Sequence, residues 1–284
     1  METRKGGKAG KPTLLGKLLA MLPVSCALLY PLYLAAQLDT VEAHYRNGAL
    51  PRAFGGLRVA YVSDIHYGAF LKEDRVRALV RRVNALQPDL ILLGGDYGDD
   101  SETAIRFFEL APSFLARFGV IAAVGNHDRT LPESNLGRLT AAMAGDGVIP
   151  LVNDVWTLEK DGKRLAVAGV DDYFNGHPDI DKVSALCRDA DFTVFIPHNP
   201  DILPRTLGHG PFYQLALCGH THGGQVTLFG HSVHCSTETG DRYRSGWYHE
   251  RGADILVSNG VGTSGFPVRL GARPQIHLLT LKTE

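Results

Sequence analysis

Five short segments of the sequence carry histidine, aspartate or asparagine directly after what reads as a buried strand. They are Asp64-Ile65-His66, Gly95-Asp96, Gly125-Asn126-His127-Asp128, Pro197-His198-Asn199 and Gly219-His220-Thr221-His222. Carboxylate, imidazole and carboxamide groups are ligands for hard or borderline divalent cations. A pair of such cations is a common device for breaking phosphate esters. The spacing of these residues therefore predicts a hydrolase whose metal ligands come from several strand ends.

The elements that must position these segments alternate between strand and helix. Apolar runs predict strands over 57–62, 90–93, 120–124, 192–196 and 215–218, and helical spacing predicts helices over about 73–86, 102–117, 133–144 and 181–187. Lys160-Asp161-Gly162-Lys163 indicates a hairpin turn. This alternation predicts an α/β fold, in which ligands gather outside the carboxyl ends of the strands. Every metal-binding segment falls at such an end.

The expected chemistry follows from the side chains themselves. Asp64 and His66 are two residues apart, so both can point the same way as the chain leaves a strand. Asp96 is a carboxylate suited to bridging two cations, and a water held between them would become the hydroxide that attacks phosphorus. His127 is expected to donate a proton to the leaving oxygen, oriented by Asp128.

This set of motifs resembles the calcineurin-like metallophosphoesterases. The segments 219–225, 257–265 and 267–270 are similar to the membrane-associated, YkuE/YaeI-type phosphodiesterase branch of that family, and the resemblance covers about residues 57–281. It implies a four-layer αββα sandwich with two divalent metal ions, which could be manganese, iron or zinc. By resemblance, one ion would be held by Asp64, His66, Asp96 and His222, and the second by Asp96, Asn126, His198 and His220. His127 and Asp128 would assist the leaving group.

Other acidic residues need not be ligands. Asp99, Asp100, Asp171 and Asp172 are expected to be solvated loop carboxylates, with Asp99 the closest to the motifs. The segment after Asp96 also departs from the family pattern, because Gly98 stands where an aliphatic residue is usual before the second acid.

The front of the chain predicts a membrane segment. Residues 1–17 form a basic tail, with five basic residues against one glutamate, and residues 18–36 contain no charged residue. Nineteen uncharged residues are about long enough to cross a bilayer as a helix, and the basic tail predicts a cytoplasmic N-terminus with the catalytic domain on the far side. A cleaved signal peptide, leaving a secreted domain, is the alternative. Residues 37–56 are expected to be a linker and 57–284 the phosphoesterase domain.

Charge and composition limit the function classes. The formal net charge of −1 provides no basic field for nucleic acid, so none is expected as a partner. A phosphoester substrate is expected, as a phosphodiester or a pyrophosphate, and attachment to a membrane favours a lipid-linked or nucleotide-linked one such as UDP-2,3-diacylglucosamine. The alternative is a catalytically silent scaffold at the membrane, which should have lost ligands that this sequence keeps.

Overall fold

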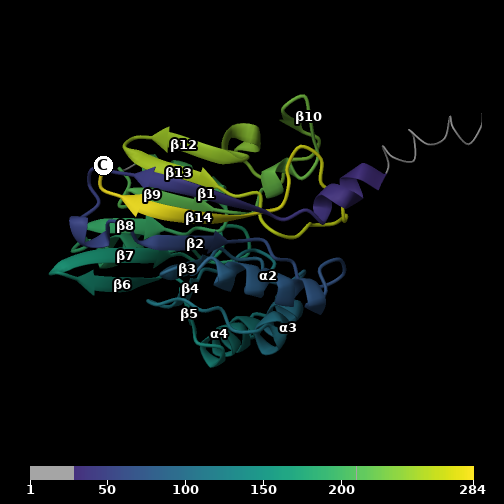
Figure 1. Ribbon diagram of the computed structural model, residues 1–284, viewed down its shortest axis with the longest axis horizontal. Coiled ribbons are helices and arrows are strands. Elements are labelled where there is room, and N and C mark those ends of the chain that lie inside the picture. The colour runs from purple at the N-terminus through teal and green to yellow at the C-terminus, as the bar shows by residue number, and fades with distance from the viewer. Residues whose placement is uncertain (1–28, 209) are drawn as a thin grey trace, which may run out of the picture.

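Two six-stranded β-sheets form the centre of the protein, whose computed structural model describes residues 29–208 and 210–284 (Figure 1). The first sheet has the order β1 (Asp39–Arg46), β14 (Gln275–Lys282), β2 (Arg58–Val62), β3 (Leu90–Leu93), β4 (Val120–Ala122) and β5 (Val148–Pro150). The second has the order β12 (Gly246–Glu250), β13 (Ala253–Val257), β9 (Leu215–Cys218), β8 (Phe192–Phe195), β7 (Lys163–Gly169) and β6 (Asp154–Lys160). A separate hairpin pairs β10 (Thr227–Leu228) with β11 (His231–Ser232).

The sheets pack face to face, and helices cover their outer faces. In β2, Val59 and Tyr61 belong to an apolar cluster shared with the second sheet, whereas Ala60 and Val62 belong to a cluster shared with helices. This alternation follows from the two-residue period of a strand. The helices on the first sheet are α2 (Glu73–Ala85), α3 (Ser101–Leu110) and α4 (Asn135–Gly145), and those on the second are α5 (Ile180–Leu186) and α6 (Leu203–Gly208). The fold is therefore a mixed α/β sandwich, as the sequence predicted.

Short 3₁₀ helices interrupt the connecting loops. They are η1 (Arg52–Phe54), η2 (Pro200–Ile202), η3 (His222–Gly224) and η4 (Gly240–Tyr243). The motif segments leave five strands that are parallel within their own sheets: β2, β3 and β4 in the first, and β8 and β9 in the second. Because the carboxyl ends of parallel strands share one edge, all five motifs are delivered to the same end of the sandwich.

Two expectations about the secondary structure were wrong. The segment 37–56 is not simply a linker, because residues 39–46 form the edge strand β1, which pairs in parallel with β14. The helix expected over 102–117 ends at Leu110, two residues before Pro112. Proline disfavours helical geometry in the preceding residue, so the chain turns away there.

The predicted membrane segment lies mostly outside the part of the chain that the structure describes. Residues 1–28 are not described, which covers the basic tail and most of the predicted span 18–36, and residues 29–35 are helical. Among the described residues, no helix has the length and apolar character needed to cross a bilayer.

Candidate metal centre

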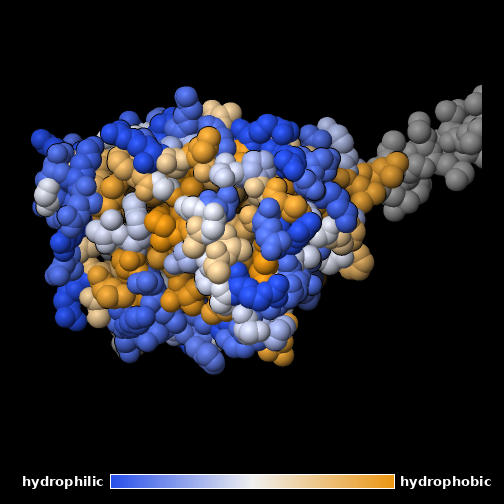
Figure 2. All heavy atoms as spheres, turned by 90° about the horizontal axis from the view of Figure 1, so that it is seen from below, coloured by the Kyte–Doolittle hydropathy of each residue, from blue (hydrophilic) through white to orange (hydrophobic). Residues whose placement is uncertain are grey.

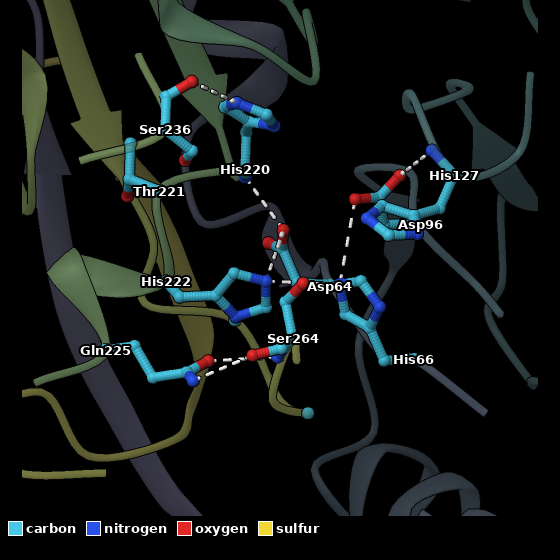
Figure 3. A network of polar contacts seen from close by, with 12 residues as sticks. Asp64, His66, Asp96, His127, His220, Thr221, His222, Gln225, Ser236 and Ser264 are labelled. Atoms are coloured by element: carbon cyan, nitrogen blue, oxygen red, sulfur yellow. Dashed lines mark hydrogen bonds and ion pairs between the residues drawn. The ribbon is translucent and has the colours of Figure 1, made fainter. Parts of the chain in front are cut away.

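The structure brings the predicted residues together at the carboxyl edge of the two sheets (Figure 3). Three overlapping groups have ligand atoms within 4.8 Å of one another: Asp64, His66 and His222; His66, Asp96 and His127; and Asp96, His198 and His220. His66 and Asp96 each belong to two groups. The groups therefore form one continuous cluster in which Asp96 occupies the middle.

Distances within the cluster define two neighbouring half-sites. On one side, His222 Nε2 lies 3.1 Å from His66 Nε2 and 3.8 Å from Asp64 Oδ1. On the other side, His198 Nε2 lies 3.1 Å from Asp96 Oδ2. Asn126 joins this second half-site, because its Oδ1 lies 2.8 Å from His220 Nδ1. All seven predicted ligands thus face the cluster.

The ligand side chains are aimed by strained backbone. Asp64, His66, Asp96, His220 and His222 all have positive φ angles, between 50° and 69°. Such a conformation costs a non-glycine residue about 1–3 kcal/mol and persists only where the surroundings enforce it. Backbone hydrogen bonds provide that enforcement: the amide of Asp64 donates to Gly95 O at 2.9 Å, and that of His66 to Asp96 O at 3.1 Å. The strain turns residues two apart in the chain towards one point.

Two glycines let the backbone approach the carboxylates closely. A Cβ atom at Gly125 would lie 2.3 Å from Asp96 Oδ1, and one at Gly219 would lie 2.4 Å from Asp64 Oδ2. Neither distance is tolerable for a carbon–oxygen contact. Glycine is therefore required beside each of these two carboxylates.

Carboxylates and histidines in the cluster shift one another's pKa values. Burial raises the pKa of Asp96, but His198, His127 and His66 outweigh this and hold it well below its usual range. Burial lowers the pKa of His198, yet Asp96, with Asp64 and Asp172, raises it to about 10. A proton on His198 thus occupies part of the role that a cation would take, and a metal ligand must give up that proton.

An unpaired buried oxygen and a neutral histidine also fit the binding of divalent cations. Asp64 Oδ2 is buried and has no hydrogen-bond partner among the described residues. Buried polar atoms are normally satisfied, so an orphaned carboxylate oxygen in this cluster fits a role as a cation ligand. Burial and the charge of His198 lower the pKa of His220 to about 4, which keeps that ring in the neutral, ligating form.

The expected role of Asp128 needs correction. Its carboxylate accepts the backbone amides of Asp96, Gly125 and Tyr97 at 2.7, 2.8 and 3.0 Å, so it ties the exits of β3 and β4 together. His127 Nδ1 instead contacts the backbone carbonyl of Asp99 at 2.7 Å. Asp99, not Asp128, therefore orients the His127 ring.

Two other acidic residues were expected to be solvated and are buried. The Asp171 carboxylate lies 2.9 Å from Arg129 Nε. Asp172 accepts the amides of Phe174 and Asn175 at 2.8 and 2.6 Å. The Asn175 side chain in turn donates to Asn126 O at 2.9 Å. These contacts fold the 171–177 loop against the cluster.

Arg269 was not identified by sequence reasoning as part of the site. It is fully buried and donates to His222 O at 2.6 Å and to Gly262 O at 3.2 Å, while its Nη2 lies 3.0 Å from His222 Nδ1. Arg269 therefore holds the Nδ1 side of the His222 ring, and Nε2 is the ring nitrogen that faces His66 and the cluster. The sequence signal for Arg269 was its place in the segment 267–270, which resembles the YkuE/YaeI-type branch but carries no metal-binding motif.

A cavity of about 510 Å³ opens over the cluster. Its floor includes Asp96, Asn126, His127, His220 and His222, and its wall includes Val226, Val233, Phe266 and Val268. This size falls within the range of small-molecule sites. The cavity therefore presents metal-ligating groups on one side and apolar groups on the other.

Comparison with known proteins assigns the family. The profile of the calcineurin-like phosphoesterases matches residues 57–235. The chain is 29% identical to the uncharacterized metallophosphoesterase YkuE of Bacillus subtilis, over 87% of this chain and 86% of that relative. It is 27% identical to the phosphodiesterase YaeI of Escherichia coli, over 84% and 85%. It is also 29% identical to a bovine (Bos taurus) transmembrane protein with a metallophosphoesterase domain, over 82% of this chain and 54% of that one.

The chain belongs to the calcineurin-like phosphoesterase family, and it is a hydrolase of phosphoester bonds. The prediction made from the order of the motifs is thereby confirmed.

Proposed function

We propose that the protein is a phosphodiesterase that uses two divalent cations, drawn from manganese, iron and zinc. Asp64, His66, Asp96 and His222 would hold one cation, and Asp96, Asn126, His198 and His220 the other. The observation that carries this proposal is the overlap of the candidate ligand groups at Asp96. A carboxylate has two oxygens, so one residue can serve both half-sites. The relative YaeI, whose name is that of a phosphodiesterase, supports the reaction type.

The residues of the chain have separable tasks in this proposal. Bound divalent cations would supply Lewis acidity and a strong nucleophile from water at neutral pH. His127 lines the cavity next to the cluster, and its Nδ1 is held by Asp99 O, which leaves Nε2 free to protonate the leaving oxygen. Burial lowers the pKa of His127, but Asp96 and the Asp99 carbonyl outweigh it and raise that pKa, which favours the proton-bearing form.

The substrate we propose is an amphiphilic phosphodiester or pyrophosphate. The phosphate would lie at the ligand-bearing floor, and an apolar group would lie along Val226, Val233, Phe266 and Val268. A lipid-linked compound such as UDP-2,3-diacylglucosamine has both parts. The uncharged segment 18–36 and the transmembrane relatives support attachment to a membrane, with the catalytic domain on the side opposite the basic tail.

Hydrolysis of bis-p-nitrophenyl phosphate with added Mn²⁺ tests the proposed reaction. We expect Asp96→Ala and His220→Ala each to lower kcat/KM by at least about a hundredfold, because loss of even an outer partner of a metal ligand costs 10–100-fold. His44→Ala is the matched control, since His44 is an exposed histidine on the edge strand β1. Equal rates in all four proteins would refute the proposal.

A catalytically silent scaffold is the second candidate function. It is disfavoured because every predicted ligand faces the cluster. Metal analysis of the purified protein separates the two functions. A content of less than one ion per chain, with no hydrolysis of any phosphoester, would favour the scaffold.

A further inference from the structure

The β10–β11 hairpin places a phenylalanine where the backbone disfavours it. Leu228 pairs with His231, so Phe229 and Gly230 form a two-residue turn, and both have positive φ angles, 51° and 86°. Hairpin turns of this kind favour asparagine followed by glycine. A bulky residue with positive φ is strained, and the Phe229 side chain is fully exposed. The turn therefore holds an aromatic ring in solvent at a cost in backbone strain, with no packing gain inside the chain.

The strained ring is one of a set of exposed apolar side chains at this end of the molecule, which we call the apolar rim. Its members, all of them exposed, are Leu228, Phe229, Val233, Phe266, Phe70 and the helix side chains Leu29, Tyr30, Leu32 and Tyr33. Val233 and Phe266 line the catalytic cavity. A second hollow joins Leu32 and Phe70 to the 262–267 loop, and Arg269 N donates to Pro31 O at 3.0 Å.

The apolar rim leads into the uncharged part of the N-terminal sequence. Figure 1 places the hairpin and the helix of residues 29–35 at the same end of the molecule, and Figure 2 shows hydrophobic colouring over that helix where it projects from the body. The sequence before it stays free of charge back to Leu18. A large exposed apolar patch on a protein marks a surface that contacts a partner or a membrane.

We propose that the apolar rim rests on a lipid bilayer, with Phe229 inserted at the level of the lipid headgroups and the catalytic cavity opening onto the membrane surface. The occupant is a bilayer rather than a second copy of the chain, because the rim is continuous with an uncharged segment of bilayer-spanning length. Tyr30 and Tyr33 fit this placement, since tyrosine favours membrane interfaces. The inference deepens the proposed function, because a substrate embedded in the same bilayer would enter the cavity from the side of Val233 and Phe266.

Depth-dependent fluorescence quenching tests this contact without relying on turnover. The full chain, with Cys26 and Cys235 replaced by serine, is inserted into nanodiscs of phosphatidylcholine and phosphatidylglycerol. A bimane probe is placed at Phe229→Cys or, as the control, at Leu115→Cys, an exposed position before β4 begins and therefore at the edge opposite the site. We expect nitroxide-labelled lipids to quench the probe at position 229 several times more strongly than the probe at position 115.

The remaining outcomes overturn the inference. Equal, weak quenching at both positions would show that the hairpin stays in water. A disulfide between two chains of the unlabelled Phe229→Cys variant, together with no quenching of the labelled one, would assign the rim to self-association. Either result leaves hydrolysis of soluble substrate untouched, so failure of this inference is distinct from failure of the proposed function.

A second variant separates membrane contact from folding. Phe229→Asn introduces the residue that the turn favours, so we expect it to keep or raise Tm. Hydrolysis of bis-p-nitrophenyl phosphate should stay unchanged, because Phe229 does not line the cavity. Hydrolysis of an acyl-chain p-nitrophenyl phosphodiester presented in vesicles should fall several-fold. Unchanged hydrolysis of the vesicle substrate would contradict the inference.

Discussion

Alanine substitutions at two glycines should remove different numbers of metal ions. At Gly125 the new Cβ would lie 2.3 Å from Asp96 Oδ1 and 2.8 Å from Asp96 N, and at Gly219 it would lie 2.4 Å from Asp64 Oδ2. An ordinary carbon–oxygen contact needs about 3.4 Å, so each carboxylate must move by about 1 Å. Overpacking of this kind costs about 1–3 kcal/mol. A misplacement of about 1 Å at a reacting centre can cost about a hundredfold in rate.

The two substitutions differ in which half-site they disturb. Asp96 lies in two ligand groups, whereas Asp64 lies in one. We therefore expect Gly125→Ala to weaken the binding of both cations and Gly219→Ala to weaken the binding of one. Mass-spectrometric metal analysis after dialysis should show close to no ion per chain in the first variant and about one in the second. The rate with bis-p-nitrophenyl phosphate should fall about a hundredfold in both.

Gly137→Ala is the matched control for the same chemical change. Gly137 lies in α4, and a Cβ there would meet nothing within 4 Å. Replacing a helical glycine by alanine stabilises a protein by about 0.4–1 kcal/mol, so this variant should keep its metal and gain slightly in Tm. Full metal content and wild-type rate in Gly125→Ala would refute the close approach that the structure assigns to Asp96.

Three other substitutions test single features. Asp128→Ala should lower the free energy of unfolding by about 3 kcal/mol, because it leaves three buried amides without an acceptor. His127→Ala should instead lower kcat by about 10²–10⁴-fold at unchanged Tm. The reverse pattern would restore a catalytic role to Asp128. Arg269→Met should lower Tm by about 6–12 °C, because it removes about 3 kcal/mol of buried hydrogen bonding. The control Arg106→Met, at an exposed position, should leave Tm unchanged. Burial lowers the pKa of His277 to about 4, so the folded protein loses stability as the pH falls from about 6.5 towards 4. In urea unfolding, His277→Leu should therefore recover about 2 kcal/mol of unfolding free energy at pH 5 relative to pH 7.5.

Much of the fold could be predicted from local pattern. The apolar run 90–93 forms β3, the helical spacing after Lys72 forms α2, and the turn at 161–162 joins β6 to β7. Strand β1 could not be found in this way. Only Tyr45 within it is buried, and its partner strand β14 begins at Gln275, more than two hundred residues along the chain. Its stability comes from non-local pairing, which no window of sequence displays.

The candidate site likewise has parts that local sequence predicts and parts that depend on distant segments. The predicted ligands share a local signature, a polar residue at the exit of an apolar strand, and the structure brings all of them together. The structural roles of Asp128 and Arg269 cannot be seen in a local signature, because each is defined by backbone groups from other segments. From the motif alone, Asp128 is interpreted as a catalytic group, and only the structure shows that its carboxylate accepts three backbone amides. Burial of Asp171 depends likewise on Arg129, forty-two residues away.

The position of the site also makes it depend on the packing between the two sheets. Asp64 and Asp96 leave the first sheet, whereas His198, His220 and His222 leave the second. The distance between these groups is therefore set by the apolar layer that separates the sheets. One contact connects that layer to the site: the Tyr61 hydroxyl donates to Leu217 O in the second sheet at 3.2 Å and lies where a Cβ of Gly94, two residues before Asp96, would be. Because close-packed interiors transmit strain, a change in this layer alters the separation of the carboxylates from the histidines without touching either.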